Sequence, residues 1–264
     1  MSYTLLPLIR RARDYHLYSQ KGERYLDLYQ DGGRAILGHK PRNLYKILKN
    51  EMQKGLMAEI PSVFNKRFEK AILRLTGENR QVRIYSSFEN ALAAAQKLLG
   101  KTFREKHIQE PFFIKDENAP VYFRPFTDIN YSRFPILFPV LPFPGSFAPQ
   151  SILIRKEIIS SYEKDLPSDS VSPVLLAGLL HLTEELQKEA ESPDIWKSWK
   201  LPEWKRFGCY CFPRSIPEDY TQFFNRFLAE GIIISPNPER PILLPRIFSP
   251  GEQSIVERLA AEKA

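Results

Sequence analysis

Apolar residues recur every three or four positions in two stretches near the start of the chain, residues 43–55 and 62–77. The apolar positions are Leu44, Ile47, Leu48 and Met52 in the first stretch and Phe64, Phe68, Ala71, Ile72 and Leu75 in the second. Each stretch begins with a polar residue that can cap a helix and ends at a glycine. Both are therefore predicted to be helices that pack one face on a core.

A strand and a helix are predicted next, joined by a tight turn. Residues 82–85 have the composition of a short strand, and Ser86-Ser87-Phe88-Glu89 has the form of a capping box that begins a helix. A strand that leads into the amino terminus of a helix presents backbone amides to an anion. Capping boxes are usually structural, so the motif alone indicates a phosphate site only weakly.

The centre of the chain contains Pro-Phe-Phe-Ile-Lys-Asp-Glu at residues 111–117. An apolar run that ends in paired carboxylates predicts a buried strand that delivers Asp116 and Glu117 to the carboxyl edge of a sheet, where open α/β sheets bind ligands. Another strand is predicted at residues 151–154, and a long helix begins at Ser172-Pro173. From Asp116 to Arg155 the chain contains no lysine.

The two ends of the chain have a different pattern. Residues 15–29 alternate around a turn at Gly22, which predicts a two-stranded ribbon. Residues 191–206 are interpreted as a linker, and residues 207–264 predict strands and helices of a compact α+β unit. His39, in Gly-His-Lys-Pro, is interpreted as a turn residue that holds its neighbours.

Composition adds few constraints. The 264 residues are 43% hydrophobic and 26% charged, which is ordinary for a soluble protein of one or two domains. No apolar run approaches the roughly 18 residues needed to cross a bilayer, and the first residues do not resemble a signal peptide. A cytoplasmic protein without a membrane partner is predicted. Cys209 and Cys211 lack a second cysteine pair, so they are interpreted as apolar strand residues and not as metal ligands.

The formal net charge of +7 is compatible with a polyanionic partner. Trp196, Trp199 and Trp204 are each followed by a lysine and would suit base stacking, which defines a nucleic-acid-binding alternative. The basic residues are spread along the whole chain, however. Packing of the three indoles against a domain is the favoured interpretation.

Several motifs follow the order of one enzyme family. Residues 37–41, Leu-Gly-His-Lys-Pro, are similar to a Leu-Gly-His-x-x-Pro turn, and residues 85–91, Tyr-Ser-Ser-Phe-Glu-Asn-Ala, to Asn-Ser-Gly-Thr-Glu-Ala. Residues 113–117 are similar to a strand that ends in Asp-Glu, and residues 144–154 to a glycine-rich stretch. With these motifs the chain resembles the class III aminotransferases, the ornithine and acetylornithine aminotransferase branch of the fold type I pyridoxal-phosphate (PLP) enzymes.

The resemblance implies roles for five residues. Ser86, Ser87 and Phe88 fall where the family binds the cofactor phosphate. Asp116 matches the aspartate that pairs with the pyridine nitrogen of the cofactor, and Ser168 matches a threonine that reaches the phosphate of a neighbouring subunit.

The chain departs from the family pattern at the positions that would bind the cofactor and carry out the reaction. Leu141 stands at the position of the Schiff-base lysine, and an alkyl side chain has no amine. Ser87 and Phe88 replace the glycine and the hydroxyl residue of the phosphate turn. The connector between Leu99 and Phe112 is short where the family carries a long part of its large domain.

The expected fold is α/β, similar to the PLP-dependent transferases of fold type I, with a truncated large domain and an α+β small domain. Residues 1–60 are expected to contribute to the small domain, residues 61–190 to form the reduced large domain, and residues 207–264 the C-terminal α+β part. The resemblance implies a homodimer. The preferred hypothesis is a catalytically inactive protein without PLP that retains a scaffold for a small anionic metabolite or a partner such as an aminotransferase paralogue.

Two alternatives remain open at the level of the sequence. One is a genuine PLP-dependent aminotransferase with its lysine elsewhere, and Lys115 is the nearest lysine to Asp116. On an extended strand, however, adjacent side chains point to opposite faces, so Lys115 and Asp116 would not address one cofactor. The other alternative is a basic protein that binds nucleic acid through the Trp-Lys segment.

Overall fold

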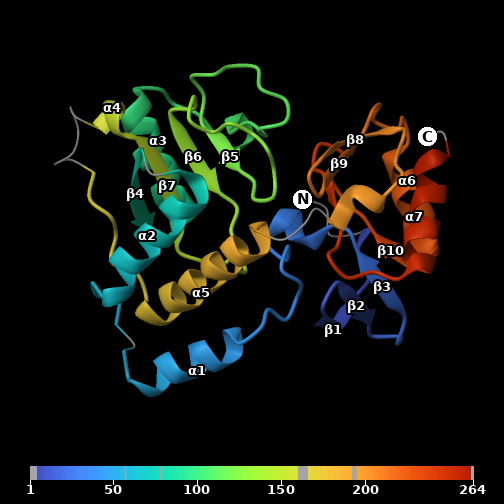
Figure 1. The fold of residues 1–264 in the computed structure, drawn as a ribbon, viewed down its shortest axis with the longest axis horizontal. Coiled ribbons are helices and arrows are strands. Elements are labelled where there is room, and N and C mark those ends of the chain that lie inside the picture. The colour runs from blue at the N-terminus through green and yellow to red at the C-terminus, as the bar shows by residue number, and fades with distance from the viewer. Residues whose placement is uncertain (1–4, 57, 78, 160–165, 192–194, 263–264) are drawn as a thin grey trace. The chain divides into compact units, whose positions relative to one another are not determined.

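The computed structural model describes residues 5–56, 58–77, 79–159, 166–191 and 195–262. The chain forms two compact units, Arg42–Ser192 and the pair of segments Met1–Pro41 and Pro193–Ala264 (Figure 1). Both units combine helices and strands, so the predicted mixed α/β character is confirmed. Among the helices that the structure describes, none has the length and apolar character of a membrane span.

The unit of Arg42–Ser192 is built on a four-stranded sheet with the order β4-β7-β6-β5. The strands are β4 (Arg80–Tyr85), β5 (Val121–Phe123), β6 (Ile136–Pro139) and β7 (Gln150–Arg155). Strand β7 runs antiparallel to both β4 and β6, while β5 and β6 are parallel. The three strands β4, β5 and β6 therefore point the same way, and their carboxyl ends lie at one edge of the sheet.

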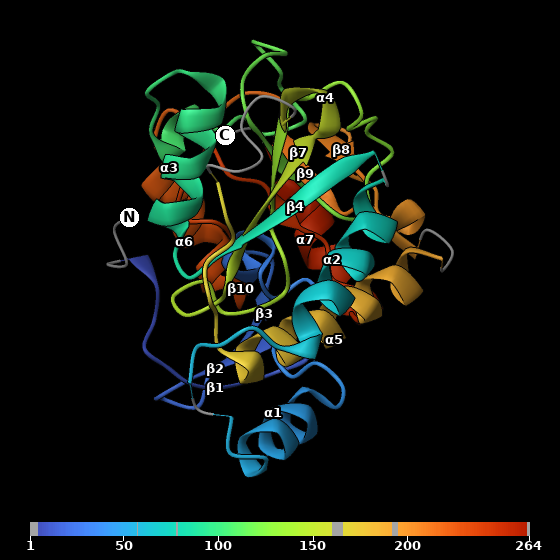
Figure 2. The same cartoon turned by 90° about the vertical axis from the view of Figure 1, so that its left-hand side faces the viewer.

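Helices cover both faces of this sheet. The helices of this unit are α1 (Leu44–Gln53), α2 (Val63–Thr76), α3 (Phe88–Leu99), α4 (Lys156–Ile159) and α5 (Pro173–Ala190), with a short 3₁₀ helix at Glu105–His107. Helix α1 packs on α5. Helix α3 lies on one side of β4, and α2 and α5 lie on the other (Figure 2). The helices predicted at residues 43–55 and 62–77 are α1 and α2, so both predictions are confirmed.

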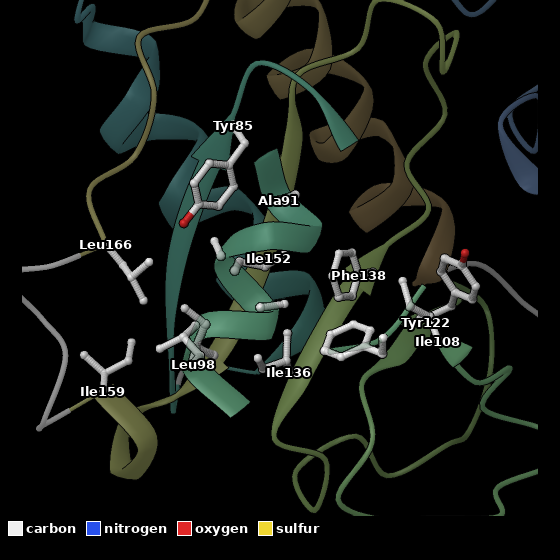
Figure 3. Close-up of a cluster of buried hydrophobic side chains, with 14 of the residues drawn as sticks. Tyr85, Ala91, Leu98, Ile108, Tyr122, Ile136, Phe138, Ile152, Ile159 and Leu166 are labelled. Carbon is white, nitrogen blue, oxygen red and sulfur yellow. The ribbon is translucent and has the colours of Figure 1, made fainter. Parts of the chain in front are cut away.

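A buried apolar cluster joins α3 to the sheet. Side chains that share one face of the strands, among them Ile136, Phe138 and Ile152, pack against Ala91 and Leu98 of the helix (Figure 3). Alternate residues of a strand point to opposite faces, so the remaining strand side chains face α2 and α5. Burial on both faces explains why β5 (Val-Tyr-Phe) and β6 (Ile-Leu-Phe-Pro) are continuous apolar runs.

The prediction of a strand at residues 112–117 is wrong. These residues form turns, and Lys115, Asp116 and Glu117 are exposed. The side chain of Gln109 holds the loop: its Oε1 accepts from the Lys115 amide at 2.6 Å, and its Nε2 donates to the Asp116 carbonyl at 2.6 Å. The apolar run is only three residues long and is followed by turn-forming residues, so the next apolar run, β5, becomes the edge strand instead.

The other unit joins the two ends of the chain. Its strands β1 (Ile9–Arg13), β2 (His16–Ser19), β3 (Arg24–Asp27) and β10 (Ile232–Ile233) form one sheet in that order. A second sheet has the order β11-β9-β8, with β8 (Trp204–Phe207), β9 (Tyr210–Pro213) and β11 (Ile242–Leu243). The helical segments are α6 (Tyr220–Ala229), α7 (Pro250–Ala261) and the 3₁₀ segments Gln30–Gly33 and Ile195–Ser198. Strand β10 pairs in parallel with β3, which fixes the C-terminal part to the N-terminal ribbon.

Candidate functional site

The carboxyl edge of the β4-β7-β6-β5 sheet is the place where an α/β protein binds ligands. Three segments leave the sheet there: the turn from β4 into α3, the residues after β5 that begin at Arg124, and the residues after β6 that begin at Val140. Of the residues with implied roles, Ser86, Ser87, Phe88 and Leu141 lie on these segments. Asp116 does not.

Asp116 lies at the opposite edge. Its loop precedes β5, and Gln109, which holds the loop, forms a bridge with Val121 at the start of that strand. Asp116 is exposed, and its Oδ1 accepts a hydrogen bond from the Asn118 amide at 2.9 Å. The sequence-based placement of Asp116 at the carboxyl end of a strand is therefore wrong, and so is the placement of Lys115 on that strand.

A carboxylate from another part of the chain occupies the turn between β4 and α3. Asp169 Oδ2 accepts three hydrogen bonds: from the Ser86 amide at 3.0 Å, from Ser86 Oγ at 2.9 Å and from Asn90 Nδ2 at 2.9 Å. Partial burial raises the pKa of Asp169, but the bonds from Ser86 and Asn90 outweigh this effect and lower it overall. Asp169 is thus held as an anion at the start of α3.

The N-cap residue of α3 lies one position later than the sequence predicted. The predicted capping box has Ser86 as the cap residue, but the cap residue is Ser87, whose Oγ accepts from the Asn90 amide at 3.1 Å. Ser86 instead turns both of its donors to Asp169. Phe88 is the first residue of α3, and its ring packs against Phe138 at a centroid distance of 5.8 Å.

Residues 166–169, which we call the strap, run along the outer edge of β4. The Ile84 amide donates to Ser168 Oγ at 3.0 Å, and the Asp169 amide donates to the Ile84 carbonyl at 2.8 Å. Arg83 Nε donates to the Leu166 carbonyl at 2.9 Å. Ser168 thus lies beside the β4–α3 turn, and its hydroxyl fixes the strap to the edge strand.

The end of β5 presents a cation. Arg124, only 1% exposed, donates from Nε to Glu110 Oε2 at 2.9 Å and from a terminal nitrogen to Glu110 Oε1 at 2.5 Å. Its amide donates to the hydroxyl oxygen of Tyr131 at 3.1 Å. Burial raises the pKa of Tyr131 to about 12, so this hydroxyl stays protonated at neutral pH. A bidentate ion pair between the buried Arg124 and the partly buried Glu110 therefore lies at the carboxyl end of β5.

The residues after β6 are apolar and buried. Leu141 is 6% exposed, and Val140 and Phe143 are buried as well. The Phe143 ring approaches Gly178 of α5 so closely that a Cβ added at Gly178 would lie 2.9 Å from it. Side chains of this kind fill space and carry no titratable group.

Asp169, Arg124 and Glu110 are the functional candidates that the sequence did not reveal. Asp169 sits in a polar loop without a motif. Arg124 follows Val-Tyr-Phe, an apolar run bounded by Pro120, which would have predicted the β5 strand had it been preferred to residues 112–117.

The histidines make structural contacts. His39 Nε2 lies 2.7 Å from Oδ2 of the buried Asp27, and this is consistent with the turn-holding role predicted for His39. His16 Nε2 lies 2.7 Å from Glu252 Oε1. Among the described residues, no group of three or more histidine, cysteine, aspartate or glutamate side chains could hold a metal ion.

The Trp-Lys segment offers no stacking platform. Trp196, Trp199 and Trp204 are all buried, and the indole nitrogens of Trp196 and Trp204 donate to the carbonyls of Pro245 and Ala260 at 3.2 Å. The packing interpretation of these residues is confirmed. Base stacking through them would require the unit to unfold, so the nucleic-acid alternative loses the feature on which it rested.

The comparisons with known proteins agree with this architecture. The chain is 30% identical to an uncharacterized protein of Borreliella burgdorferi over 258 residues, which cover 96% of this chain and 90% of that protein. The chain belongs to the same protein family. No family model matches the chain. A shorter similarity, 29% identity over 104 residues, relates 39% of this chain to 25% of glutamate-1-semialdehyde 2,1-aminomutase of Clostridium acetobutylicum.

Solved structures show that this chain has an aminotransferase-like fold. Acetylornithine aminotransferase from Elizabethkingia anophelis matches with a TM-score of 0.66 at 11% identity, over 97% of this chain and 93% of that chain. Ornithine δ-aminotransferase from Plasmodium falciparum matches with a TM-score of 0.64 at 12% identity, over 96% and 91%. The sequence-based resemblance to the ornithine and acetylornithine aminotransferases is confirmed for the fold.

Proposed function

We propose that this protein is a shortened aminotransferase-fold protein that carries out no PLP-dependent transamination and uses its scaffold for binding. The observation that carries the proposal is the lack of any lysine from Asp116 to Arg155, a segment that contains β5, β6, β7 and their connections. A Schiff base requires an amine at the cofactor. At the position where the resemblance places that amine, Leu141 is a buried alkyl side chain.

The other groups at the carboxyl edge fit PLP poorly as well. Strand β5 pairs in parallel with β6, and the residue that follows β5 is Arg124, which is paired with Glu110. A protonated pyridine nitrogen needs a carboxylate, and the Glu110 carboxylate is already bound by the Arg124 guanidinium. At the β4–α3 turn, the donors of Ser86 are already bound to Asp169. The described residues at this edge therefore do not fit PLP.

The retained function is binding, with a small anionic metabolite or a protein partner as the ligand. An active aminotransferase paralogue and a second copy of this chain are the partners that the resemblance favours. Helix α1 supports a protein partner: Tyr45 is 71% exposed and Met52 is 55% exposed. Together with Leu48, Lys49 and Gln53 they line an apolar groove on this helix. Exposed apolar patches of this kind often mark interaction surfaces.

The absence of a Schiff base is tested by incubating the protein with equimolar PLP, reducing it with borohydride and mapping the peptides by mass spectrometry. An active aminotransferase serves as the positive control. We expect no stoichiometric lysine adduct and no visible Schiff-base absorbance. A stoichiometric adduct at Lys115 that disappears in Lys115→Arg would contradict the proposal and favour the genuine PLP enzyme. An adduct at any other single lysine would do the same for that residue.

A further inference from the structure

The contacts of Asp169 have the form of a bound anion. One carboxylate oxygen accepts from a backbone amide, a hydroxyl and a side-chain amide, all at the turn where β4 leads into α3. Phosphate oxygens accept the same set of donors at such turns. Asp169 reaches this position from 83 residues away along the chain.

We propose that Asp169 is a built-in anion that closes the β4–α3 turn to phosphate, and that the strap of residues 166–169 holds it there. This inference rests on the proposed function, because it explains why a scaffold of this kind would not retain a phosphorylated cofactor. A tethered carboxylate competes at a high effective concentration, so an external phosphate must displace it before it can bind.

The strap is attached to an edge strand. Strand β4 is the last strand of its sheet, and the Ile84 amide and carbonyl on its outer edge are satisfied by Ser168 and Asp169. An edge strand without such a partner would expose these groups. The strap therefore has two roles: it covers the edge of β4, and it places the Asp169 carboxylate over Ser86.

The attachment is limited to local contacts. Ser168 is exposed and Asp169 is half-buried, while Leu166 at the start of the strap is buried in the apolar cluster under α3. Loss of the Asp169 carboxylate leaves the Leu166 anchor and the Ser168 contact in place. A substitution at Asp169 should therefore open the turn without removing the strap.

The experiment titrates the protein with inorganic phosphate and follows the amide resonance of Ser86 by ¹H–¹⁵N NMR. In the wild-type protein we expect no saturable shift of this resonance. In Asp169→Ala we expect a saturable shift, from which an apparent Kd for phosphate can be fitted. Asp116→Ala, which removes an exposed carboxylate from the same unit, is the matched control and should behave as the wild type.

Two results would overturn the proposal. Saturable binding at Ser86 in the wild type, as tight as in Asp169→Ala, would show that the carboxylate does not close the turn. A lack of binding in both would show that the turn is not an anion position. If Asp169→Ala does not fold, Asp169→Asn takes its place, because its neutral oxygen retains the shape of the side chain and is a weaker acceptor. A lysine adduct with PLP would refute the proposed function but would leave this phosphate titration unaffected.

Discussion

Two carboxylates, Asp169 and Glu252, show how single residues organise the start of a helix. Each lies at the first turn of a long helix, and its carboxylate accepts several hydrogen bonds there. Glu252 belongs to its own helix, α7, and completes a capping box with Ser249. Asp169 comes from a distant segment, so it ties α3 to the strap.

The contacts of Glu252 predict how the stability of its unit changes as the pH is lowered. Burial raises the pKa of Glu252, but bonds from Ser249, His16 and Arg24 outweigh this effect and lower it from 4.5 to about 2. A lowered pKa means that the stabilisation is present at neutral pH, begins to fall below about pH 4.5 and is lost near pH 2.

We expect Glu252→Gln to reduce the free energy of unfolding at pH 7 by about 1 to 2 kcal/mol, because charged acceptors make the stronger hydrogen bonds. The measurement is urea denaturation at a series of pH values, with the exposed Glu117→Gln as the control. The difference between wild type and Glu252→Gln should shrink as the pH falls from about 4.5 towards 2. A difference that stays constant with pH would contradict this account.

At the scale of elements, the close packing of neighbouring segments on α5 depends on one small residue, Gly178. A Cβ built at Gly178 would lie 2.8 Å from Leu48 Cδ2 and 2.9 Å from Phe143 Cε2. Gly178 therefore lets α1 and the segment after β6 approach α5 closely, although glycine weakens the interior of a helix by about 1 kcal/mol. Helix α1 and the Leu141–Phe143 segment take their positions from this contact.

We expect Gly178→Ala to lower the free energy of unfolding by about 1 to 2 kcal/mol. The added methyl group overpacks the contact, and this destabilisation exceeds the stabilisation from the higher helix propensity of alanine. Gly251→Ala is the matched control: Gly251 is also helical, and the nearest atom to its added Cβ is Ser249 Oγ at 4.0 Å. Its stability should be unchanged or slightly higher in thermal unfolding. Equal stability of Gly178→Ala and wild type would show that the close approach is not required.

At the scale of the whole molecule, the exposed apolar residues of α1 make association the property to measure. Interfaces of stable complexes bury about 1,200 to 2,000 Å² and place aromatic side chains and methionine near their centre. Tyr45 and Met52 have this character, and helix α1 uses its other face to pack on α5. The proposed homodimer is consistent with these features.

We expect the wild-type protein to have the mass of a dimer in size-exclusion chromatography with light scattering, and Tyr45→Lys/Met52→Lys to have the mass of a monomer. Two lysines would have to be desolvated at the interface, which costs several kcal/mol. Ile247→Lys is the control, because Ile247 is 60% exposed and belongs to the other unit. A monomeric wild type, or a double variant that remains a dimer, would rule out α1 as the interface.

Local signals in the sequence were sufficient for several elements. The periodicity of residues 43–55 and 62–77 predicted α1 and α2, and the turn at Gly22 predicted the ribbon of β2 and β3. Helix α5 begins where Ser172-Pro173 predicted it to begin. In each case the residues that determine the element are neighbours in the chain, so their interactions do not depend on the rest of the fold.

By itself, the sequence determined an aminotransferase-like α/β chain with no lysine between Asp116 and Arg155. Only the tertiary structure decided which apolar run forms the edge strand, that Asp116 lies away from the carboxyl edge, and that Asp169 lies over Ser86. The physical reason is distance along the chain. Strand order and the pairing of Ser86 with Asp169 arise from contacts between remote residues, and local propensity carries no information about those contacts.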